Sequence, residues 1–346
     1  MKQRQETLQI AKWNHSWMAF VLILAGLGVL VALMAFSITR GVSDISALTA
    51  FEALFRFDPQ NSHHLIVLDL RLPRVIASAL VGAALAVAGA VMQGVTRNPL
   101  ADSGLMGLNA GAGFALAVSF AFFPSLSYLQ TILICFAGAA LGAVMVMSVA
   151  SLRRGGTAPM RMVLAGAAIS ALLTALSQGI ALCFDVSQDI MFWTVGGVSA
   201  ASWDQVAIMT PFILGALACA IAASRQISLM SLGEEVAKGL GANIKLINAF
   251  CSVIVVVLAG ISVSVVGAVG FIGLIIPHIT RFLVGVDYRL IVPVSAVLGS
   301  LLMVAADLGA RTMNPPAEIP VGALIAITGV PFFLYLARNQ RSSKSL

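Results

Sequence analysis

The chain has 346 residues, of which 60% are hydrophobic and 10% charged, with a mean hydropathy of +1.00 and a formal net charge of +6. A soluble domain carries about 25% charged residues, so this composition excludes a soluble enzyme and predicts an all-α integral membrane protein. The positive charge forms no basic run or stripe, which argues against a nucleic-acid partner. No long polar stretch interrupts the chain, so residues 1–346 are predicted to form a single transmembrane domain.

About ten transmembrane helices are predicted in chain order, because roughly 20 apolar residues cross a bilayer as a helix. The second predicted span is long for a straight crossing, so we expect it to tilt or to extend beyond the bilayer. The eighth is short and rich in glycine, so we expect it to be partly irregular. The predicted spans are 17–36, 64–95, 104–122, 128–150, 161–183, 203–223, 246–266, 268–284, 290–308 and 320–337.

The distribution of Lys and Arg predicts the orientation of these spans. Ten spans place both termini on one side of the membrane. With that side inside, 15 of the 20 Lys and Arg residues are internal, and the five external ones are Arg40, Arg56, Arg71, Arg74 and Arg311. Because basic residues concentrate in cytoplasmic loops, both termini are predicted to be cytoplasmic.

Small residues repeat every four positions in three of the predicted spans, over Gly82–Gly94, Gly138–Gly142 and Ala167–Gly179. Small residues at this spacing let helix backbones approach closely in lipid, so all three stripes predict close helix packing. A second stripe in the fifth span consists of Ser170, Thr174 and Ser177. Hydroxyl groups can be satisfied by the backbone of their own helix, so neutral packing and the polar lining of a transport path both remain open.

Several kinds of chemistry are missing from the sequence. There is no GxxxxGK[ST] motif to hold nucleotide phosphates, no catalytic motif and no cluster of Cys and His, so we predict neither an enzyme, nor a bound cofactor, nor a metal site. The acidic residues near the spans all fall at or near span ends. Ion-coupled carriers need buried carboxylates, so this pattern favours a permease that is energised by other subunits. An ion-coupled secondary transporter remains the second hypothesis.

A short amphipathic helix is predicted at about 229–241, between the sixth and seventh spans. Ser231 and Glu234 match an S-x-x-E capping box, and Gly239 can end the helix. Leu232, Val236 and Leu240 fall on one apolar face. The helix could lie flat on the bilayer, but its two adjacent acids favour docking into a protein groove.

Motifs along nearly the whole chain resemble the permease subunits of the FecCD-type ABC importers for ferric siderophores, haem and vitamin B12. The matching segments are 70–74 (LRLPR), 82–89 (GAALAVAG), 98–107 (NPLADSGLMG), 232–241 (LGEEVAKGLG), 270–281 (GFIGLIIPHITR), 317–322 (AEIPVG) and 329–334 (GVPFFL).

This resemblance implies a type II ABC importer permease fold in a bacterial cytoplasmic membrane. It also implies a second permease subunit (the same chain or a paralogue), two cytoplasmic ATPase subunits that bind ATP and Mg, and an extracytoplasmic solute-binding protein. The breadth of the family favours a ferric siderophore as cargo, with vitamin B12 or haem as alternatives.

The resemblance also implies roles for particular residues. Arg71, Arg74 and Arg311 match basic residues of the outer mouth that dock the binding protein, and we expect them to be exposed. Alternatively, Arg311 pairs with Asp307, and Arg71 and Asp69 are interfacial anchors. Coupling to the ATPase is implied for Leu232, Gly233, Glu234, Glu235, Lys238 and Gly239.

The cytoplasmic gate of the family matches Asn98, Leu100, Pro159 and Met160. Some relatives carry small hydroxyl residues at the last two positions, so the constriction is expected to be more apolar in this chain. Asn98-Pro99 is also an ordinary turn sequence, and the sequence does not separate a structural role from a gating role here.

Overall fold

The computed structural model of the protein describes residues 2–41, 44–151 and 159–342, and these residues form helices, turns and irregular segments without a strand. The helices are α1 (Lys2–Thr39), α2 (Ala47–Phe55), α3 (Ser62–Leu65), the π-helix η1 (Ile66–Arg71), α4 (Leu72–Thr96), the 3₁₀-helix η2 (Ser103–Met106), α5 (Leu108–Phe122), α6 (Tyr128–Ser151), α7 (Pro159–Cys183), α8 (Ser187–Gly196), α9 (Trp203–Ser231), α10 (Glu234–Gly239), α11 (Ile244–Val266), α12 (Ile272–Val284), α13 (Tyr288–Thr312) and α14 (Val321–Ser342).

Each of the ten predicted spans corresponds to a helix. Seven stretches of the described chain are long and apolar enough to cross a membrane, and α5, α12 and α14 are shorter apolar helices. The second span is continuous from Ser62 to Thr96, which is about 52 Å at 1.5 Å per residue. The helix is thus longer than a straight crossing needs, as predicted, whereas tilting or extension beyond the bilayer stays a prediction. The eighth is also as predicted. Only 13 residues of this predicted span are helical, as α12, and the chain before the helix turns through Gly267 and Phe271, both with positive φ.

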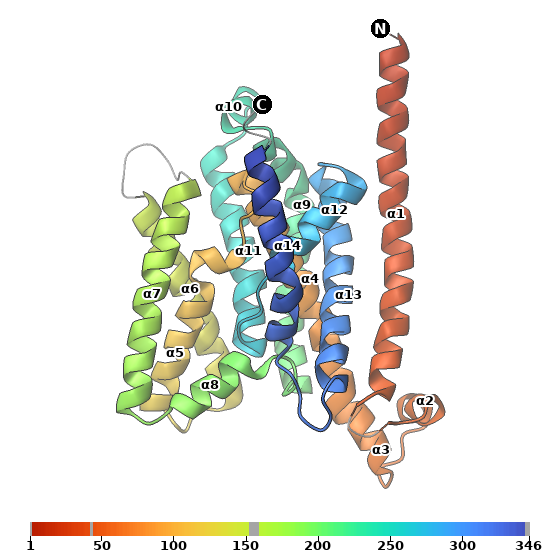
Figure 1. The fold of residues 1–346 in the computed structure, drawn as a ribbon, viewed down its shortest axis with the longest axis vertical. Helices are drawn as coiled ribbons and strands as arrows, with labels where there is room; N and C mark the ends of the chain where they lie inside the picture. Colours follow the sequence, from red (N-terminus) through yellow and green to blue (C-terminus); the bar gives the residue numbers. More distant parts are fainter. Residues whose placement is uncertain (1, 42–43, 152–158, 343–346) are drawn as a thin grey trace.

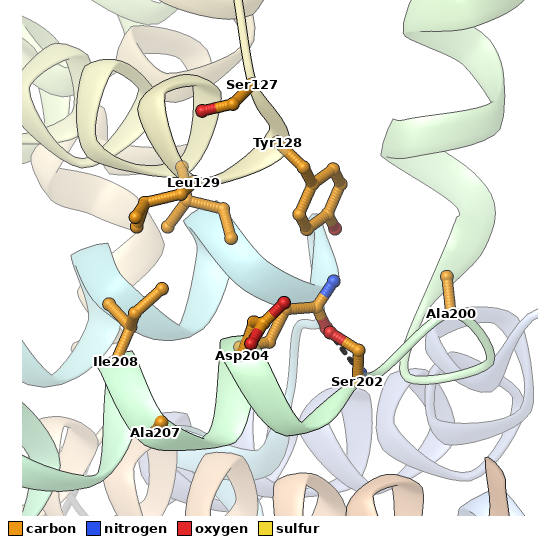
Figure 2. A pocket seen from close by; sticks show the side chains of 10 residues that line it. Ser127, Tyr128, Leu129, Ala200, Ser202, Asp204, Ala207 and Ile208 are labelled. Carbon is orange, nitrogen blue, oxygen red and sulfur yellow. Dashed lines mark hydrogen bonds between the residues drawn. The ribbon is translucent and has the colours of Figure 1, made fainter. Parts of the chain in front are cut away.

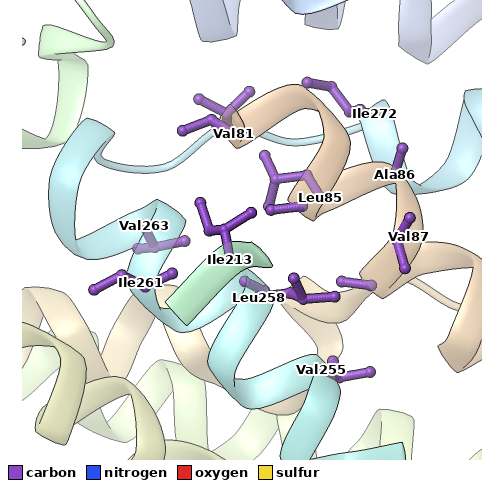
Figure 3. Packing of buried hydrophobic residues seen from close by; sticks show 14 of the residues in the cluster. Val81, Leu85, Ala86, Val87, Ile213, Val255, Leu258, Ile261, Val263 and Ile272 are labelled. Atoms are coloured by element: carbon purple, nitrogen blue, oxygen red, sulfur yellow. The ribbon is translucent and has the colours of Figure 1, made fainter. Parts of the chain in front are cut away.

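The helix α4 forms the centre of the bundle. It packs against α9, α11, α12 and α13, and Figure 3 shows its Val81, Leu85 and Val87 among side chains from α9, α11 and α12. A Cβ added at Gly82 would overlap the carbonyl oxygen of Gly299 in α13. Such a contact is possible only between residues without side chains, so the predicted packing role of the Gly82–Gly94 stripe is confirmed.

The other two small-residue stripes differ from each other. Gly138 and Gly142 of α6 lie against Gly111 and Gly107, as a GxxxG pattern predicts. The stripe Ala167–Gly179 does not pack within the described chain, because its four small residues are exposed on α7. The prediction of close packing within the bundle is therefore wrong for this stripe. A repeat of small residues does not indicate whether the surface that it fits belongs to the same subunit.

The two ends of the bundle are distinct. The start of α1, the end of α14 and the short helix α10 lie at one end, which we call the α10 end (Figure 1). The opposite end carries α2, α3 and α8, and we call it the α2 end. The placement of both chain termini at one end agrees with an even number of crossings.

Candidate functional site

The helix α10 is shorter than its sequence predicts. It has six residues, because α9 continues without a break to Ser231. The predicted capping box is wrong, since the Ser231 hydroxyl donates to the Ser228 carbonyl at 2.7 Å within α9. The residue that precedes α10 is Gly233, whose φ of +118° is a conformation that side chains other than glycine's rarely adopt. The S-x-x-E pattern alone cannot indicate that its serine, Ser231, is the last residue of the preceding helix α9 and not the N-cap of a new helix.

The apolar face predicted for α10 is present, and the chain itself does not cover it. Leu232 and Leu240 are each 64% exposed, and Val236 is exposed between them. The helix rests on the bundle through its other side, where Ala237 is buried in a cluster with Met230 and Ile244. The exposed side also carries Glu235, Lys238 and Gly239. The α10 end thus presents leucine and valine side chains outward, next to charges of both signs.

An ion pair joins α10 to the predicted gate. The Arg97 guanidinium lies 3.6 Å from the Glu234 carboxylate, and both side chains are 42% exposed. Arg97 is the C-cap residue of α4 and precedes Asn98, whose side-chain oxygen accepts from the Leu100 backbone N–H at 3.0 Å. Asn98 therefore holds a turn here, which is the structural alternative. The gating role is a separate property and stays a prediction.

The other half of the predicted gate is only partly described. Pro159 begins α7, but the side chains of Pro159 and Met160 lie outside the described residues. The turn after α4 is held from another direction. The Asp102 carboxylate accepts from the Ser103 backbone N–H at 2.9 Å and lies against Gly273, the second residue of α12. Burial raises the pKa of the Asp102 carboxyl, and backbone hydrogen bonds from Ser103 and Gly104 oppose that rise.

Polar residues that the sequence analysis did not single out connect the helices at the α10 end. The Gln93 amide of α4 donates to the Gly273 carbonyl at 2.8 Å and accepts from Arg281 of α12. Ser228 of α9 donates to the Asp287 carboxylate at 3.2 Å, at the start of α13. A buried amide in an apolar span is itself an indication of such a contact, and Gln93 could have been found by that criterion.

The three hydroxyl residues of the predicted path lining lie in different surroundings. Ser177 is buried, and its hydroxyl donates to the Gly113 carbonyl of α5 at 3.2 Å, which is the packing alternative. Thr174 is exposed, and Ser170 is half-buried. The exposed face around Thr174 also carries Gln178. A path-lining role stays a prediction for Thr174 and Ser170.

The three arginines at the α2 end are buried, so the expectation that they are exposed is wrong. Arg71, Arg74 and Arg311 are between 4% and 8% exposed. Arg74 donates to both oxygens of Asp307 at 2.8–3.2 Å and to both oxygens of Glu318 at 2.8 and 3.0 Å. The Arg74 guanidinium thus binds two carboxylates that lie more than 200 residues away from it in the sequence.

The remaining two arginines extend this ion cluster to α1. Arg311 lies 3.6 Å from the Asp307 carboxylate, which is the alternative pairing weighed above, and it also bonds the Ser37 hydroxyl. Arg71 donates to the Ile38 carbonyl at 2.7 Å. We refer to Arg71, Arg74, Asp307, Arg311 and Glu318 as the ion cluster. Its three cations and two carboxylates tie α1, α4, α13 and the segment before α14 together.

A cavity of about 680 Å³ opens at the α2 end between the starts of α6 and α9. Tyr128, Leu129 and Ile208 supply apolar walls, and Asp204 and Ser202 supply polar groups (Figure 2). None of the residues predicted for gating, docking or path lining lines this cavity, so it is distinct from the sites above.

Comparisons with known proteins add independent findings. The profile of the FecCD transport family matches residues 29–339. The iron(3+)-hydroxamate import system permease protein FhuB of Bacillus subtilis is 48% identical over 98% of this chain and 88% of that protein. The Fe(3+)-citrate import system permease protein YfmD of the same bacterium is 40% identical over 94% of this chain and 95% of that protein. A solved inward-facing metal-chelate type ABC transporter is 26% identical, with a TM-score of 0.79 over 92% of this chain and 98% of that chain.

Proposed function

The chain belongs to the FecCD transport family and is a permease of the iron-chelate class of ABC importers, and we propose that it carries a ferric hydroxamate siderophore across a bacterial cytoplasmic membrane. The observation that carries the choice of cargo is the 48% identity over 98% of the chain to a relative named for hydroxamate import. The relative named for citrate import is 40% identical. Vitamin B12 and haem remain alternatives for the test.

The proposed ATPase partners bind at the α10 end. Leu232, Val236 and Leu240 would lose contact with water in such a complex, and burying a leucine side chain contributes about 1.5–3 kcal/mol. An exposed row of apolar side chains flanked by charges fits a groove in another protein. ATP and Mg would be bound by these partners, since the chain has no phosphate-binding loop of its own.

The proposed coupling runs through the ion pair between Glu234 and Arg97. When the ATPase subunits close, α10 would move with them, and Glu234 would displace the C-cap of α4 next to Asn98 and Leu100. An exposed ion pair is worth at most about 1 kcal/mol, so it would position the gate without locking it. Pro159 and Met160 would form the facing part of this gate, and Ser170 and Thr174 would line the path beyond it.

The α10 end is the cytoplasmic end in this proposal, with both termini inside. The support is the excess of Lys and Arg in the segments at this end. The binding protein would then dock at the α2 end. Since Arg74 already holds Asp307 and Glu318, a docking role for the ion cluster would require a partner carboxylate to replace Glu318, the more exposed of the two acids.

Uptake of labelled iron tests the proposed cargo. Cells that lack this chain but contain its ATPase and binding protein would be offered radiolabelled iron as hydroxamate, catecholate and citrate chelates, with labelled vitamin B12 and haem alongside. We expect the restored chain to recover uptake of the hydroxamate chelate. Recovery of another compound alone would overturn the cargo while leaving the importer in place.

A further inference from the structure

The helix α2 exposes a large apolar face outside the membrane-spanning helices. Leu48, Phe51 and Phe55 are between 58% and 71% exposed, and the rings of the two phenylalanines are 4.6 Å apart. The opposite side of the helix, at Ala50 and Ala53, is buried against the feet of α1 and α4. A helix with one side on the protein and three large apolar side chains directed outward needs a second apolar surface.

The depth of α2 follows from its attachment to α1. The apolar run of α1 ends at Phe36, about 30 Å from its start at Trp17, which is the thickness of the hydrocarbon core. The Ile45 backbone N–H donates to the Thr39 carbonyl at 3.0 Å, so the chain returns to the end of this span just before α2 begins. Arg40 lies over the Phe36 ring at 5.3 Å, and aromatic and basic residues of this kind mark the membrane–water boundary.

The direction and position of α2 point to lipid. In Figure 1 the helix is seen nearly end-on beside spanning helices that are seen from the side, so its axis runs across the bundle. It also lies at the rim, next to α1, whose own outward face is apolar and exposed from Trp17 to Phe36. Leu48, Phe51 and Phe55 therefore belong to a helix that lies beside the exposed apolar face of a predicted membrane span.

We propose that α2 is an interfacial helix that lies in the outer boundary of the bilayer, with Leu48, Phe51 and Phe55 among the acyl chains. Arg56, which caps the C-terminal end of the helix, is exposed and is placed to meet lipid phosphates. Because Ala50 and Ala53 share a buried cluster with Val67 and Val75, the helix also anchors the part of the chain that carries Arg71 and Arg74.

Spin-label accessibility tests this proposal. Single cysteines would replace Leu48, Phe51 or Phe55 in a variant that lacks the four native cysteines, and the labelled protein would be placed in phospholipid vesicles. Collisions with oxygen, which concentrates in lipid, are compared with collisions with a water-soluble nickel chelate. The reference positions are Phe20 of α1 for the lipid and the exposed Gln60 for water. We expect the ratio of oxygen to nickel collisions at the three α2 positions to be several-fold above that at Gln60 and close to that at Phe20.

A ratio equal to that at Gln60 would overturn the proposal, because it would place the face in water. Protection from both reagents would also overturn it, in favour of a protein contact. Dipolar broadening between labels would then identify a second copy, and protection that appears only with added binding protein would identify a docking surface. No transport step enters this measurement, so its failure leaves the proposed function standing, and a wrong cargo leaves this result unaffected.

Discussion

Arg74 and Arg97 lie at opposite ends of α4, and their surroundings differ. Arg74 is buried and holds two carboxylates at 2.8–3.2 Å, whereas Arg97 is 42% exposed and approaches one carboxylate at 3.6 Å. The chain therefore supplies the partners of the buried Arg74 itself, and removing one of them would leave buried charge uncompensated. The α10 end is held by a weak pair and leaves leucines exposed, which suits a surface that a partner completes and moves.

The largest expected effect is on stability at the α2 end. Replacing Asp307 by Asn removes the carboxylate that Arg74 and Arg311 share, and breaking a buried ion pair in this way costs about 3–5 kcal/mol. The unfolding midpoint in detergent should fall clearly. The matched control is Asp44→Asn, whose carboxylate pairs with Arg40 on the surface, where the loss is at most about 1 kcal/mol. Equal midpoints for the two variants would show that the ion cluster does not stabilise the fold.

The next largest effect concerns partner binding at the α10 end. The double variant Leu232→Ser with Leu240→Ser should weaken binding of the ATPase subunit at least about tenfold, since 1.4 kcal/mol corresponds to a factor of ten. Its unfolding midpoint should not change, because both side chains are exposed. The control is Leu182→Ser, because Leu182 is an exposed leucine in the last turn of α7. That helix ends next to α8, at the α2 end of the bundle (Figure 1). Full ATPase binding by the double variant would argue against α10 as the docking element.

A charge exchange tests whether the weak pair at the α10 end matters. Arg97→Glu alone and Glu234→Arg alone should each lower ATP-driven transport about two- to fivefold, the equivalent of 0.5–1 kcal/mol. The double exchange should recover most of the loss, because it restores opposite charges. Losses that simply multiply in the double variant would mean that the two residues act independently.

The smallest effect concerns the face of α7 between the two ends. In a background without the native cysteines, Thr174→Cys should react with a polar thiol reagent, because the position is exposed. Ser177→Cys should stay protected, because Ser177 is buried against α5. Protection of Thr174→Cys in every transport state would assign that face to packing against lipid or another subunit.

The comparison also shows what the sequence can and cannot predict. Spans are predicted well because a bilayer requires a long apolar run, and this requirement is local. The pairing of Arg74 with Asp307 and Glu318 joins residues more than 200 positions apart, and the sequence does not show that α4 and α13 lie side by side. The family resemblance implies that the three arginines are exposed, and only the i, i+4 pairing of Arg311 with Asp307 can be predicted from the sequence.

At the α10 end, the spacing of Leu232, Val236 and Leu240 correctly predicts a row of apolar side chains, and the structure shows that this row is exposed. The sequence overestimates the length of this helix, because the S-x-x-E match starts it before Gly233, the positive-φ glycine that separates α9 from α10. The Arg97–Glu234 contact cannot be predicted from the sequence, because, like the ion cluster, it depends on how distant helices pack in the tertiary structure.

The most direct test of this account uses vesicles that contain the chain with its ATPase and binding protein, and it follows the accumulation of labelled ferric hydroxamate. Accumulation should require ATP on the side of the α10 end, and the double variant Glu234→Lys with Glu235→Lys should abolish it while the protein remains in the membrane. Accumulation driven by a proton gradient without ATP, or an unchanged rate in the variant, would contradict the assignment of α10 as the element that couples ATP hydrolysis to iron import.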